Sequence, residues 1–136
     1  MTTYSIVITM AGIGLLAGAA FGAETEVFDV GKELGKASQG RSVVNVPLLK
    51  KAEYTVNAVA VKDEIPTHRH ENGNHVLYIV SGQGTATVGA ESIPLKAGVL
   101  VHIPRGVEHR IQAQGGQLRF VDFAPHSADP GAKEKK

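Results

Sequence analysis

No cysteine occurs among the 136 residues of the sequence, and tryptophan is also absent. The missing thiols exclude disulfide bonds, zinc–thiolate sites, iron–sulfur clusters and cysteine nucleophiles. Any metal ion must therefore be bound through His, Asp, Glu or water. The lack of cysteine does not fix the cellular compartment, because a barrel with an adequate core needs no disulfide whether it is exported or not.

A strong charge of one sign is also lacking. The formal net charge is +1, and the charged residues are scattered apart from a cluster at 133–136. Without a basic stripe, nucleic acid is not an expected partner. The sequence contains no Ser-His-Asp order, no P-loop and no glycine-rich dinucleotide signature, so it gives no support for those classes of enzyme.

No helical period runs through the chain, which is long enough for one domain with a hydrophobic core. Glycine is abundant (16 residues), and Val, Ile and Thr recur in short runs. Strand-like segments alternate with glycine turns at intervals of about ten residues. We predict strands at 42–49, 54–61, 65–70, 75–80, 84–88, 93–95, 99–103, 109–113 and 118–123. The predicted fold class is all-β, a single antiparallel β-barrel over residues 42–126.

The beginning of the chain carries no charge. Residues 1–23 contain no Asp, Glu, Lys, Arg or His, and an apolar run at 6–16 is followed by small residues. This pattern predicts a signal peptide over residues 1–22, cleaved after Gly22, although no Lys or Arg precedes the apolar run. We expect an exported protein, periplasmic or secreted, that is not membrane-bound once the signal is removed. The alternative is an uncleaved N-terminal membrane anchor, because a run of about 18 uncharged residues could just span a bilayer.

Two segments flank the predicted barrel. Residues 23–41 are expected to form an N-terminal arm and loop, with a short strand at 24–30 and a polar loop at 31–40. Residues 127–136 are expected to be a disordered tail. Since an arm of this kind, or a sheet face, can pair with a second copy, we expect a homodimer.

Four of the six histidines have the spacing of metal ligands. In a strand, His68 and His70 point to the same face, so both imidazoles can reach one ion. His75 follows a turn and shares a strand face with Leu77, and His109 follows a second turn. Neutral imidazoles suit iron, copper, nickel, zinc and manganese. The alternative is that these histidines belong to a pocket that binds no metal.

The same residues resemble the two motifs of the cupin superfamily. The first segment is His68-x-His70-x4-His75-x6-Gly82, and the second is Gly98-x5-Pro104-x-Gly106-x2-His109. In that family the first motif supplies two His and one Glu as metal ligands, and the second supplies one His. The resemblance implies a cupin-type jelly roll and a metal held by His68, His70, His75 and His109.

One departure concerns the metal directly. His75 stands at the family's Glu position, so an all-imidazole set leaves the full charge of a divalent ion and favours a small anionic ligand in its open positions. Some cupins with similar patterns are dioxygenases. The resemblance therefore implies a metal-dependent enzyme, dioxygenase-like or an isomerase or lyase, acting on a small oxygenated or anionic compound. The alternative is a module that binds a metal or small molecule without turnover.

Other polar residues are assigned smaller roles. His102 is expected to be a packing or supporting residue, because it alternates out of phase with its apolar neighbours. Arg69 and Arg110 are each next to a predicted ligand and are expected to project outward. The barrel interior shows no obvious carboxylate base, which favours binding or oxygen chemistry over acid–base lyase chemistry.

Overall fold

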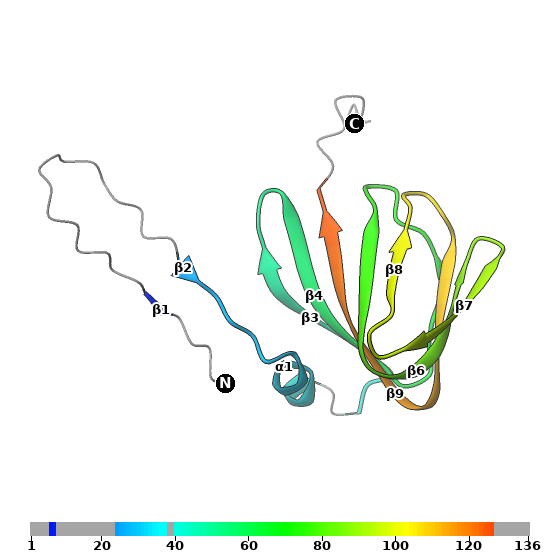
Figure 1. Ribbon diagram of the computed structural model, residues 1–136, viewed down its shortest axis with the longest axis horizontal. Helices are drawn as coiled ribbons and strands as arrows, with labels where there is room; N and C mark the ends of the chain where they lie inside the picture. Colours follow the sequence, from blue (N-terminus) through cyan, green and yellow to red (C-terminus); the bar gives the residue numbers. More distant parts are fainter. Residues whose placement is uncertain (1–5, 8–23, 38–39, 127–136) are drawn as a thin grey trace, which may run out of the picture.

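The computed structural model describes residues 6–7, 24–37 and 40–126 (Figure 1). The predicted cleavage after Gly22 and the tail at 127–136 lie outside the described residues, as does most of the predicted signal segment 1–22. Two of its residues form β1 (Ile6–Val7), which pairs antiparallel with β2 (Glu24–Thr25). Among the described helices, none is long and apolar enough to cross a membrane.

The remaining strands form one seven-stranded antiparallel sheet, which confirms the predicted all-β class. Its long central strands are β6 (His75–Val88) and β9 (His109–Pro125), which pair with each other along most of their length. The shorter strands are β3 (Val43–Lys50), β4 (Tyr54–Val61), β5 (Glu64–His68), β7 (Glu91–Lys96) and β8 (Leu100–Ile103).

The register divides this sheet into two halves. Strand β8 pairs with the first half of β6, strand β4 pairs with the second half of β9, and β3 pairs with β4. Strands β5 and β7 flank the second half of β6 and the first half of β9. Figure 1 shows these halves curving toward each other, with β6 and β9 running through both. The arrangement is a jelly roll in which two strands bend from one half into the other.

Two pairs of predicted strands are therefore single strands. The segments 75–80 and 84–88 join in β6, and 109–113 and 118–123 join in β9. Gly82 has a φ of 86°, and a Cβ there would lie 2.3 Å from the carbonyl oxygen of Gln117. Only glycine fits this bend, where the register shifts but pairing continues on both sides. The glycines that predict turns here instead bend the strand.

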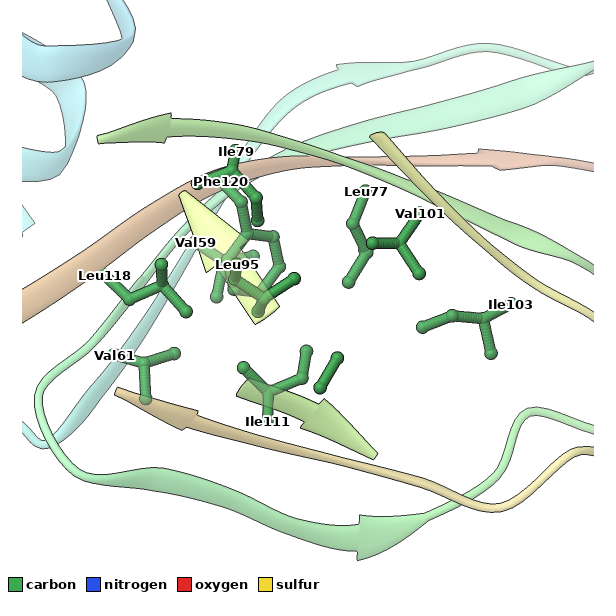
Figure 2. Close-up of a cluster of buried hydrophobic side chains, with 11 residues drawn as sticks. Val59, Val61, Leu77, Ile79, Leu95, Val101, Ile103, Ile111, Leu118 and Phe120 are labelled. Atoms are coloured by element: carbon green, nitrogen blue, oxygen red, sulfur yellow. The ribbon is translucent and has the colours of Figure 1, made fainter. Parts of the chain in front are cut away.

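The core fills the space between the two halves. Buried side chains come from both: Val59, Val61, Leu77, Ile79, Val101, Ile103, Leu118 and Phe120 from the first, and Ala86, Leu95 and Ile111 from the second. Figure 2 shows this cluster, with Leu77, Val101 and Ile103 on the side away from Leu118 and Val61. Burial of these apolar surfaces is the main force that holds the halves together.

The prediction of a polar loop at 31–40 was wrong, because helix α1 spans Val30–Ala37. Asp29 caps it: its Oδ1 accepts a hydrogen bond from the backbone N–H of Lys32 at 3.0 Å. Val30, Leu34 and Ala37 recur at helical spacing and pack on β3 and β4, and Leu34 is fully buried. The predicted strand at 24–30 is reduced to β2, which covers two residues. The Asp29 cap and this short apolar stripe were the available signals.

Candidate metal site

Three of the four histidines lie at strand ends, and the fourth lies in the loop after β5. His68 ends β5 and pairs in register with His109, the first residue of β9. His70 follows in the loop, where its carbonyl accepts a hydrogen bond of 2.8 Å from the N–H of Gly106. His75 begins β6, opposite Ile103. Residues separated by up to 41 positions in the sequence (68 to 109) thus meet at one end of the barrel.

Three of these side chains form a compact group. One ring nitrogen from each of His68, His70 and His109 lies within 4.8 Å of the others. The ring centroids of His68 and His109 are 4.2 Å apart, and those of His68 and His70 are 4.9 Å apart. Nitrogens at this spacing can converge on one ion at the usual metal–nitrogen distance of about 2 Å. This His cluster could therefore hold a metal.

Hydrogen bonds fix which ring nitrogen is available in two members of the group. Nδ1 of His68 lies 2.8 Å from the carbonyl oxygen of Pro66, and Nδ1 of His109 lies 3.0 Å from that of Val107. Because a carbonyl only accepts, each Nδ1 of the neutral ring must be the donor. Each Nε2 then keeps a free lone pair, the form that binds metals.

His75 adjoins this group without belonging to it. Its ring stacks on that of His70, with centroids 3.7 Å apart and planes inclined by 18°. Its Nδ1 lies 2.8 and 2.9 Å from the two carboxylate oxygens of Asp122. The side chains of His75 and Asp122 are 16% and 15% exposed, so the pair is largely shielded from water. The prediction that His75 is a fourth ligand remains a prediction.

Asp122 was not among the predicted site residues, and the prediction that the interior shows no obvious carboxylate base was wrong, since Asp122 lines the inner hollow. Along β9, Leu118 and Phe120 are buried, and Asp122 is the next residue in the same alternation. It pairs in register with the buried Leu77 of β6. The alternation within 118–123 was therefore a sufficient signal for an inward carboxylate.

Two hollows adjoin His70 and His75. The inner one, of about 200 Å³, is lined by apolar side chains together with His68, His70, His75, Asn45 and Asp122. The outer one, of about 440 Å³, is lined by polar residues that include Arg69, Glu71, Asn72, Asn74 and His126. The histidines thus lie between an apolar interior and a polar mouth, an arrangement suited to a small ligand.

The surroundings keep two of the imidazoles neutral. Burial lowers the pKa of His70 from its ordinary value of 6.5 to about 4, and the neighbouring His75, His109 and His68 contribute to this. Burial also lowers the pKa of His109, against the hydrogen bond to Val107. Protons therefore compete little with a metal for these rings at neutral pH.

The remaining predictions on polar residues had mixed outcomes. His102 is exposed on the outer face, between the buried Val101 and Ile103, so a packing role was wrong. Arg110 does project outward and forms an ion pair with Glu64. Arg69 is exposed as well, yet it lines the outer hollow and pairs with Glu71 at 2.5 Å.

A stability measurement on the metal-free protein tests the state of His70. A folded pKa of about 4 against 6.5 means that the unfolded chain binds more protons between these values, so the free energy of unfolding should fall as the pH is lowered through this range. One pKa unit corresponds to about 1.4 kcal/mol, and partial exposure reduces the effect, so we expect a loss of about 1–2 kcal/mol from this residue. Urea unfolding of wild type and His70→Gln isolates it. An equal pH dependence in both would contradict the assignment.

Comparisons with known proteins agree with the jelly-roll fold. The family model described as "Cupin domain" matches residues 56–124, about half of the chain. Among solved structures, an uncharacterised protein with a double-stranded β-helix domain from Klebsiella pneumoniae has a TM-score of 0.67 at 22% identity, over 77% of this chain and 93% of that chain. No curated protein matches the sequence.

Two further structures show the same fold. A cupin-2 domain containing protein from Shewanella frigidimarina has a TM-score of 0.63 at 21% identity, over 74% of this chain and 95% of that chain. KdgF from a Halomonas species has a TM-score of 0.60 at 16% identity, over 65% and 83%. Because the family model matches about half of the chain, the chain belongs to the cupin family.

Proposed function

We propose that the protein binds one divalent transition metal ion through Nε2 of His68, His70 and His109, with His75 as a fourth ligand. The observation that carries this proposal is the group of three ring nitrogens within 4.8 Å of one another. The donor set fits such an ion, because neutral imidazoles are good ligands for iron, manganese, copper, nickel and zinc.

The assignment of His75 as the fourth ligand rests on a separate observation. The carboxylate of Asp122 accepts a hydrogen bond from Nδ1 of His75, so in the neutral ring Nε2 is the nitrogen with the free lone pair. Ligating histidines commonly donate their other N–H to a carboxylate in this way. The stacking of His75 on His70 keeps the ring beside the cluster. Four imidazoles would leave two positions of a six-coordinate ion for a small molecule.

We further propose that the protein is an enzyme acting on a small oxygenated or anionic compound. The two hollows beside His70 and His75 offer room for such a ligand next to the metal. A bound metal would supply Lewis-acid or redox chemistry to it. Asp122 provides the inward carboxylate that acid–base chemistry needs. Both a dioxygenase-like reaction and an isomerase or lyase reaction therefore fit this interior. The second candidate, a binding module without turnover, is favoured if a metal-loaded protein binds a small anion but never converts it.

The metal proposal predicts one ion per chain. Replacing His68, His70 or His109 by Ala removes one ligand, so each change should weaken affinity by more than the roughly 10- to 100-fold typical for loss of a supporting partner. His75→Ala should cost about as much as His109→Ala. Elemental analysis of protein purified without a nickel column, followed by chelator competition, measures both quantities.

The control for this experiment is His102→Ala, because His102 is an exposed histidine outside the site. It should leave metal content unchanged. Wild-type affinity in His75→Ala would show that three histidines are sufficient, and absence of metal from the wild type after reconstitution would refute the proposal as a whole.

We also propose that the protein is a homodimer assembled through an outer sheet face. Tyr78, Val80, Leu100 and Phe123 are large apolar residues of β6, β8 and β9 that are 37–62% exposed. Tyr78 pairs in register with Leu100 and with Val121, so several of these side chains are neighbours on one face. An exposed apolar patch of this kind commonly marks an interface, and a self-complementary patch produces a two-fold dimer.

Light scattering at micromolar concentration tests the dimer. The wild type should have twice the mass of one chain, and Leu100→Lys should be monomeric because it places a charge in the patch. Ser92→Lys, at an exposed position of strand β7, is the matched control and should remain dimeric. A monomeric wild type would contradict the proposal.

A further inference from the structure

Asp122 is a partly buried carboxylate among apolar side chains. It lines the inner hollow beside Leu77, Phe120 and other apolar side chains, and its side chain is 15% exposed. A charge held away from water is costly unless it is paired. Within the described part of the chain, both of its hydrogen bonds go to Nδ1 of His75. These hydrogen bonds to the His75 ring offset the cost of removing the carboxylate from water.

The contact restrains His75 in two respects. The two acceptor oxygens, at 2.8 and 2.9 Å from Nδ1, keep a proton on that nitrogen, so in the neutral ring the lone pair is on Nε2. The same bonds hold one edge of the ring while its face rests on His70 at 3.7 Å. With one edge and one face fixed, the ring has little freedom to rotate away from the cluster.

The carboxylate also changes the charge of the site. Four neutral imidazoles alone would leave the two positive charges of a divalent ion uncompensated. Asp122 places one negative charge directly behind the His75 ring, so the site as a whole carries one charge less. This qualifies the sequence-based expectation that His75 leaves the full charge of the ion in place.

We propose that Asp122 is the positioning residue of the metal site: it sets the tautomer and orientation of His75 and supplies the negative charge that the imidazole ligands lack. This inference rests on the proposed metal-binding function. It assigns a role to a residue that belongs to neither histidine motif and that lies 47 positions after His75 in the sequence.

The experiment combines two readouts on Asp122→Ala, Asp122→Asn, His75→Ala and the double variant His75→Ala/Asp122→Ala. The first readout is Co²⁺ affinity by chelator competition. Asp122→Ala should weaken it by roughly 10- to 100-fold. Asp122→Asn retains an acceptor oxygen without the charge and should lie between Ala and wild type. In the His75→Ala background, loss of Asp122 should have a smaller effect, because its hold on the His75 ring is already gone and only its charge remains to be lost.

The second readout needs no metal. In ¹⁵N NMR spectra of the metal-free protein, His75 should be protonated on Nδ1 in the wild type and should become a mixture of tautomers in Asp122→Ala. Asn45→Ala is the matched control, since Asn45 lines the same hollow without a hydrogen bond to these histidines in the described residues. It should change neither readout.

The outcomes separate the two claims. If Asp122→Ala leaves Co²⁺ affinity and the His75 tautomer unchanged, or if its effect on affinity adds fully to that of His75→Ala, the positioning role is overturned. If the wild type does not bind Co²⁺, the proposed function fails and the metal-directed role of Asp122 fails with it. In that case the NMR readout still shows whether Asp122 fixes the His75 ring.

Discussion

The pairing of β6 with β9 is the constraint on which the site depends. These strands bend at the same place, where Gly82 of β6 approaches Gln117 of β9 too closely for any side chain. The bend lets a single strand, β9, contribute His109 from one half of the sheet and Asp122 from the other. Neither half alone would bring His68, His109 and the His75–Asp122 pair to one end of the barrel.

The surroundings of the histidines favour metal over protons. Burial and mutual repulsion hold the pKa of His70 near 4, while carbonyl oxygens at His68 and His109 and a carboxylate at His75 each engage Nδ1. Neutral rings with Nε2 free are the form in which imidazole ligates. Without an ion, the lowered pKa of His70 makes the free energy of unfolding decrease as the pH is lowered.

The sequence predicted the parts of this structure that follow from short-range patterns. Strand alternation placed β4 correctly, and the spacing of His68, His70 and His109 identified the compact group. The continuity of β6 was missed because a glycine in the sequence is typical both of a turn and of a bend within a strand; the positive φ of Gly82 is found at the bend. Helix α1 was missed because its apolar stripe is only two turns long and depends on the sheet beneath it. The pairing of Asp122 with His75 is a tertiary contact, so the sequence could place the carboxylate on the inner face without naming its partner.

In the proposed site, four histidines ligate one ion while Asp122 supports the fourth. A crystal structure of the Co²⁺-loaded protein, with anomalous data on both sides of the cobalt absorption edge, tests it most directly. We predict a single anomalous peak within about 2.0–2.2 Å of Nε2 in His68, His70, His75 and His109, with the His75–Asp122 hydrogen bonds intact. A peak bound by other residues, or one that His75 does not approach, would contradict it.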